Sequence, residues 1–80
     1  MIYGRWGQPL RVLRLATLDD VREFEGREPD ETDCRRVEAG NYVVTDDGLH
    51  KRVYPFRLLH SDGGAQEIAE AIRAAEGSAK

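Results

Sequence analysis

Three neighbouring residues carry the side chains of a nucleophilic catalytic triad: His60, Ser61 and Asp62. A triad needs its serine, imidazole and carboxylate linked in one chain of hydrogen bonds, and side chains on consecutive residues diverge. The distant His50 could replace His60, but the sequence shows no oxyanion site to accompany it. The similarity to a triad is therefore one of composition, and we predict no catalytic residues.

Anion binding and metal binding are the next chemistries that the residue types allow. The glycines of the stretch 61–64, ahead of a predicted helix, could bring backbone N–H groups close to a phosphate, but the Gly-Lys-Ser/Thr sequence of a phosphate-binding loop is absent. Cys34, His50 and His60 lack the short paired spacing of a structural zinc site. We predict no cofactor and no metal, and we expect Cys34 to be a small buried side chain on the inner stripe of a helix.

Charge is unevenly distributed along a chain whose net charge is -3. Residues 1–16 carry Arg5, Arg11 and Arg14 and no acid, whereas residues 17–33 carry eight acids against two arginines. Paired carboxylates can act as acid and base when their pKa values are pushed apart, but a solvated acidic surface is the simpler interpretation. Such a surface could meet a basic partner, or lie beside the arginine-rich strand of the same fold.

Aromatic and basic residues occur together in the first residues and in a predicted hairpin. Such a mixture suits single-stranded nucleic acid, although an aromatic side chain supplies so much apolar area that core packing of Trp6 competes with this role. In the hairpin, Asp46 and Asp47 face a basic run across the turn, so local charge balance can explain that run without a ligand. The candidate interaction residues are Arg5, Trp6, Arg11, Arg14, His50, Lys51, Arg52 and Tyr54.

Caps and turns divide the chain into short elements. Thr17 and Pro29-Asp30 are helix starts, Gly26 and Gly40 are helix stops, and Asp47-Gly48 is a hairpin turn. Pro55 cannot donate to a sheet and places its strand at an edge or a bulge. We predict an α+β fold in which helices cover one face of a small antiparallel sheet, with strands at 10–16, 41–46 and 51–59 and a further one at 2–6, and with helices at 18–25, 31–39 and 65–76. Residues 77–80 are expected to be a frayed tail, 60–64 a turn, and 10–16 could also form helical turns.

The chain of 80 residues is long enough for one domain with a thin core. One cysteine excludes an internal disulfide, so packing or a second copy must stabilise the fold. No apolar run approaches the ~20 residues that span a bilayer, and residues 1–7 lack a signal-peptide segment, so we expect a cytoplasmic protein without a membrane partner. The predicted core is Trp6, Leu10, Val12, Leu13, Leu15, Leu18, Val21, Phe24, Val37, Val44, Val53, Phe56, Leu58, Ile68 and Ile72.

The order helix, helix, hairpin between residues 17 and 58 resembles the DNA-binding part of winged-helix regulators. The similar passage is "RRVEAGNYVVTDDGLHKRVYPFRL", Arg35 to Leu58, in which a helix ends at a glycine and a basic hairpin follows. The resemblance implies that the basic residues after the turn, 50–52, contact DNA. It departs from that family where the second helix begins with the acidic stretch 30–33, which phosphates would repel.

These patterns favour a non-enzymatic interaction or accessory domain that acts through its charged surface or an exposed sheet edge, on a protein partner or a second copy. The alternative is nucleic-acid binding through the hairpin at 46–52 and the N-terminal arginines. A small enzyme is the third hypothesis, and it would need His50 or His60 in a pocket beside a carboxylate with a shifted pKa.

Overall fold

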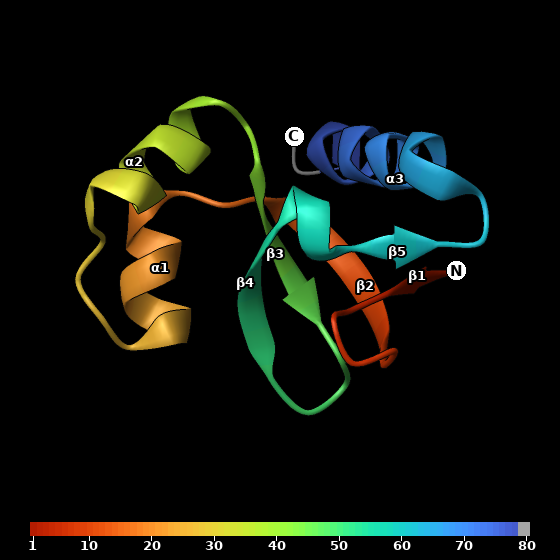
Figure 1. Cartoon of the computed structure of the whole chain (residues 1–80), viewed down its shortest axis with the longest axis horizontal. Coiled ribbons are helices and arrows are strands. Elements are labelled where there is room, and N and C mark those ends of the chain that lie inside the picture. Colours follow the sequence, from red (N-terminus) through yellow and green to blue (C-terminus); the bar gives the residue numbers. More distant parts are fainter. Residues whose placement is uncertain (79–80) are drawn as a thin grey trace.

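Two strands, two helices, three strands and a last helix follow one another along residues 1–78 of the chain (Figure 1). The computed structural model describes residues 1–78. The elements are β1 (Ile2–Tyr3), β2 (Pro9–Leu15), α1 (Leu18–Glu25), α2 (Glu31–Glu38), β3 (Tyr42–Asp46), β4 (Lys51–Pro55), the 3-10 turn η1 (Phe56–Leu58), β5 (His60–Ser61) and α3 (Gly64–Ser78). The predicted α+β fold is confirmed, and the segment predicted at 10–16 is a strand, which runs from Pro9 to Leu15. The strand predicted at 2–6 is shorter, since only Ile2–Tyr3 are in β1 and a turn follows.

The strands form one antiparallel sheet in the order β4-β3-β2-β1-β5. The predicted turn at 60–64 is partly wrong, because His60 and Ser61 pair with β1. The predicted strand 51–59 is interrupted after Pro55, where η1 leads from one edge strand to the other. The chain from Pro55 to His60 spans at most ~17 Å, whereas five flat strands would be ~19 Å across. The sheet is therefore curled.

The predicted frayed tail is also corrected at its start. Gly77 and Ser78 belong to α3, which runs two residues beyond the predicted helix end. Residues 79–80 lie outside the described part of the chain. Over residues 1–78, no helix combines the length and the apolar character needed to cross a bilayer.

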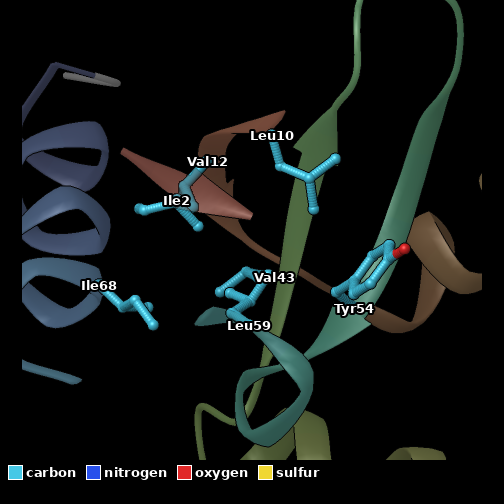
Figure 2. Close-up of a cluster of buried hydrophobic side chains, with 7 residues drawn as sticks. All are labelled: Ile2, Leu10, Val12, Val43, Tyr54, Leu59 and Ile68. Atoms are coloured by element: carbon cyan, nitrogen blue, oxygen red, sulfur yellow. The ribbon is translucent and has the colours of Figure 1, made fainter. Parts of the chain in front are cut away.

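Helices cover both faces of the sheet, and not one face as the sequence predicted. Residues 42–45 of β3 are all buried, and because side chains alternate along a strand, each face of β3 needs its own cover. One buried cluster lies against α3 and contains Ile2, Leu10, Val12, Val43, Tyr54, Leu59 and Ile68 (Figure 2). The other contains Ala16, Val21, Tyr42, Val44 and Val53, with side chains of α1 and α2 packed on it.

A β-bulge explains the imperfect alternation of β2. The register against β3 shifts between Val12 and Arg14, so that two successive side chains, of Leu13 and Arg14, lie on the side of α1. Leu15 then returns to the α3 face. A bulge of this kind adds one residue to one strand. Beyond it, the side chains of that strand alternate between the two faces of the sheet in the opposite order.

Two predictions of burial are wrong, and Leu18, which was predicted in the core, is half-buried and belongs to neither cluster. Trp6 is not buried, since 79% of it is exposed. Cys34 is exposed as well, because α2 turns Asp33 and Val37 toward the fold, and the residue after Asp33 is rotated by ~100° around the helix. The core also contains six residues that the sequence did not predict: Ile2, Ala16, Tyr42, Val43, Tyr54 and Leu59.

The first two helices begin with the same arrangement of three residues. An arginine precedes the N-cap residue by three positions, and a buried aspartate follows it by three. In each case the N-cap side chain accepts a hydrogen bond from the aspartate N–H, the aspartate accepts one from the N-cap N–H, and the arginine binds the aspartate through both terminal nitrogens. The trios are Arg14, Thr17 and Asp20 for α1, and Arg27, Asp30 and Asp33 for α2.

This arrangement gives the fold a defined response to acid. The hydrogen bonds from Arg14 and from Arg27 hold the pKa values of Asp20 and of Asp33 below their usual range. The pKa of aspartate in an unfolded chain is ~3.9. Both carboxylates therefore stabilise the fold fully above that pH, and this stabilisation is lost as the pH falls below it toward the folded pKa values.

We expect the free energy of unfolding to fall steeply below about pH 4 and to be little affected by these two groups above about pH 5. Urea unfolding followed across this range measures it. The single variants Asp20→Asn and Asp33→Asn are the controls, because each removes one of the two titrating groups, and the curve of each should be shallower. Equally steep curves for both variants would show that other carboxylates cause the acid sensitivity.

Candidate interaction groove

The turn between β1 and β2 presents the chain's single tryptophan to solvent. The N–H of Gly4 donates to the carbonyl of Gln8 at 2.8 Å, and the N–H of Gly7 donates to the carbonyl of Gly4 at 3.0 Å. A Cβ on Gly4 would lie 2.8 Å from Nε2 of Gln8 and 2.9 Å from Cδ1 of Leu10, so a larger residue here would have to displace both side chains. The exposed Trp6 therefore stands on a closely held turn.

Gln8 fixes this turn to the far edge of the sheet. Its Oε1 accepts a hydrogen bond from the N–H of Trp6 at 2.9 Å, and its Nε2 donates to the hydroxyl of Tyr54 at 2.8 Å. Tyr54 belongs to β4, and Figure 2 shows its ring at the end of the buried cluster with the hydroxyl pointing away from the other six side chains. One amide side chain thus ties the position of Trp6 to an anchored core residue.

Two adjoining hollows lie between this turn, β4 and α1. The first, of about 190 Å³, is lined by Arg5, Trp6, Glu25, Arg52, Val53, Tyr54, Pro55 and Leu58. The second, of about 380 Å³, is lined by Gln8, Phe24, Glu25, Asp47, His50, Lys51 and Arg52. Because Glu25 and Arg52 line both, the two hollows share a wall, and we call them together the Trp6 groove.

The Trp6 groove brings together six of the eight predicted interaction residues, from two segments far apart in the sequence. Arg5 lies over the indole of Trp6, with its Cζ 5.1 Å from the ring centroid, a distance typical of a cation–π contact. The basic residues that follow the hairpin turn supply the other end of the groove. Residue type alone grouped these two segments in the nucleic-acid-binding alternative, and no local pattern predicted that they would meet.

Glu25 closes much of the sheet edge that the groove borders. Its Oε1 lies 3.3 Å from Nη2 of Arg52, and its Oε2 accepts a hydrogen bond from the N–H of Val53 at 3.3 Å. The hydrogen bond that Arg52 donates to Glu25 raises the pKa of Arg52, which keeps the guanidinium charged. Pro55, two residues on, has no N–H to offer. The prediction of an edge strand at Pro55 is confirmed, but an added strand would find this edge obstructed.

The remaining two predicted residues lie outside the groove. Arg14 binds the buried carboxylate of Asp20 and belongs to the cap of α1. Arg11 is exposed, and its Nη2 lies 3.9 Å from Oδ2 of Asp46. The arginine-rich strand thus does lie beside acidic residues of the same fold.

The acids of the hairpin turn bind backbone groups. Asp46 accepts a hydrogen bond from the N–H of Gly48 at 2.8 Å, and Asp47 accepts from the N–H groups of Leu49 and His50 at 2.8 and 2.7 Å. The backbone hydrogen bonds from His50 and Leu49 lower the pKa of Asp47. Asp46 does stand opposite Lys51 in the ladder, but within residues 1–78 no ion pair includes Lys51.

The candidate catalytic and metal-binding residues are dispersed. His60 and Ser61 are successive residues of β5 and so point to opposite faces. His50 lines the groove at the other edge of the sheet together with Asp47, whose lowered pKa comes from the backbone N–H groups of its own turn. Among residues 1–78, no three His, Cys, Asp or Glu residues come together in a group that could hold a metal ion.

Several groove residues could not be recognised in the sequence. Glu25 looked like one more solvated acid of α1, and Gln8 like a turn residue. Neither their residue types nor their positions in the sequence distinguish these two residues. Their partners are Tyr54 and Val53 of β4, more than 25 residues away in the chain. Comparisons of the chain with protein-family models, curated proteins and solved structures find no match.

Proposed function

We propose that this protein is a non-enzymatic interaction domain that binds a protein partner in the Trp6 groove. The observation that carries the proposal is the 79% exposure of Trp6 on a turn held by Gly4 and Gln8. Tryptophan, tyrosine and arginine are the residues that most often dominate binding energy at protein interfaces. A side chain held in place before binding also loses less conformational entropy on binding.

The form of the Trp6 groove supports a macromolecular partner. Its two hollows, of about 190 and 380 Å³, lie on either side of the shared residues Glu25 and Arg52, so the groove is an extended surface and not one enclosed cavity. The exposed thiol of Cys34 suits a reducing compartment, and we therefore place the protein in the cytoplasm as part of the same proposal.

Replacing the indole tests this proposal. The wild-type domain, Trp6→Ala and Leu49→Ala are each immobilised and used to capture proteins from an extract of the source cell. Leu49 is the matched control, because it is 85% exposed and lines neither hollow. We expect Trp6→Ala alone to lose a captured protein, with the free energy of unfolding changed by less than about 0.5 kcal/mol.

Identical sets of captured proteins for all three domains would contradict the proposal. Light scattering of the wild type and of Trp6→Ala identifies the case in which the partner is a second copy of the chain. In that case the wild type is oligomeric and Trp6→Ala is a monomer.

Nucleic-acid binding is the second candidate, because Arg5 and Trp6 lie in one groove with the basic hairpin residues. A stacking aromatic residue beside cations is the arrangement that single-stranded nucleic acid requires. The acids Glu25 and Asp47 in the same walls oppose it. Titration with single-stranded and duplex DNA at low ionic strength, followed by Trp6 fluorescence, tests it, and absence of binding there excludes it.

A further inference from the structure

The charges of the Trp6 groove are not equally available to a partner. Glu25 is occupied by Arg52 and by the N–H of Val53, and Asp47 by two N–H groups of its own turn. Both acids that line the groove therefore already have hydrogen-bond donors. A partner would meet carboxylates with little remaining capacity to bind a cation.

The cations of the groove still have donors free for a partner. In the described part of the chain, neither Arg5 nor Lys51 takes part in an ion pair. The guanidinium of Arg5 lies over the ring of Trp6, and a stacked guanidinium keeps its N–H donors free around its rim. Arg52, whose side chain is 58% exposed, adds donors between them.

Apolar surface lies directly beside these donors. Trp6, Pro55 and Leu58 line the first hollow with Arg5, and Phe24 lines the second with Lys51. A partner must therefore supply acceptors and an apolar side chain close together. Extending the proposed function, on which this step rests, we infer that the groove binds an acidic peptide segment that places an apolar side chain beside Trp6.

The distribution of charge favours a peptide over a nucleic acid. A nucleic-acid backbone carries a phosphate at every nucleotide and needs a continuous line of cations. Here Glu25 and Asp47 interrupt the cations, and α1 adds exposed acids on the same side of the sheet. A peptide can place its carboxylates at Arg5 and Lys51 and leave the positions opposite the acids uncharged.

Selection from a random peptide library displayed on phage tests the inference, because the library offers the groove peptides of every charge and side-chain type. The full chain is the bait, and Trp6→Ala is used in parallel to remove peptides that bind elsewhere. We expect the enriched peptides to be acidic and to carry a large apolar residue. Enrichment of neutral or basic peptides, or of none, would overturn the inference.

Charge reversal then locates the contacts. The best enriched peptide is titrated into the wild type and into Arg5→Glu, Lys51→Glu and Arg73→Glu, with the fluorescence of Trp6, the single tryptophan, as the signal. Arg73 is an exposed arginine on α3 and serves as the matched control. We expect affinity to fall about tenfold for each groove variant and to stay constant for the control.

Other outcomes separate this inference from the function on which it rests. Equal affinity for all four proteins would overturn the acidic specificity, as would tighter binding of a thymidine oligonucleotide than of the peptide. If Trp6→Ala still loses its captured protein while no acidic peptide binds, the interaction domain stands and the acidic partner is excluded. If Trp6→Ala captures the same proteins as the wild type, the proposed function is excluded, and the inference that rests on it is excluded with it.

Discussion

Asp33→Ala is expected to lower the free energy of unfolding by about 3 kcal/mol, because removing a buried carboxylate leaves the groups that donate to it without their acceptor. The side chain of Asp33 is 2% exposed. It binds Arg27, accepts from the N–H of Asp30 at 2.9 Å, and accepts from the hydroxyl of Tyr42 at 2.6 Å. Such a loss is large beside the ~5 kcal/mol expected for a small domain.

Urea unfolding of the variants measures this effect, and the cap of α1 provides the matched control. Asp20 has the same arginine and N-cap N–H partners, but in place of the tyrosine it has only the longer hydrogen bond from the hydroxyl of Thr17, at 3.1 Å, so Asp20→Ala should cost less, about 2 kcal/mol. Tyr42→Phe should account for the difference, at about 1 kcal/mol for one hydrogen bond. A loss below about 1 kcal/mol for Asp33→Ala would mean that solvent replaces its contacts, as it does for surface pairs.

Ile68→Ala is expected to lower the free energy of unfolding by about 3 kcal/mol, the usual cost of removing most of a buried isoleucine. Ile68 is 3% exposed and is the residue of α3 that enters the cluster on the sheet (Figure 2). Since α3 covers one face of the sheet, the variant should also lose helical circular dichroism at a lower urea concentration.

Ile72→Ala is the control for this second prediction. Ile72 lies one helical turn further along α3 and is only partly buried, so the same chemical change should cost about 1–2 kcal/mol. Equal losses for the two variants would show that α3 is held by its whole length and not by its contact at Ile68.

Local features of the fold could be predicted well because they depend on neighbouring residues. Thr17 and Asp30 are N-caps and Gly26 ends α1, as their residue types indicate. Pro55 marks an edge strand for a similarly local reason, the lack of an N–H group. Backbone conformation and the hydrogen bonds of single residues decide such features.

The sequence predicted several residues of the candidate groove but not their arrangement in space. The residue types of Arg5, Trp6 and the basic hairpin strand marked them as interaction candidates. The same reasoning included Arg11 and Arg14, whose charges face acids of the fold, and it placed Trp6 in the core. Residue type shows which interactions a side chain can make. Its neighbours in space decide whether those interactions are made within the fold or remain available to a partner.

The sequence by itself determined the short capped helices, the acidic hairpin turn and the α+β class, because each depends on contacts within a few residues. Only the tertiary structure decided that both faces of the sheet are covered, that Glu25 closes the edge at Val53, and that Trp6 stands in solvent beside β4. These outcomes depend on the curl of the sheet and the bulge in β2, which arise from packing between distant segments.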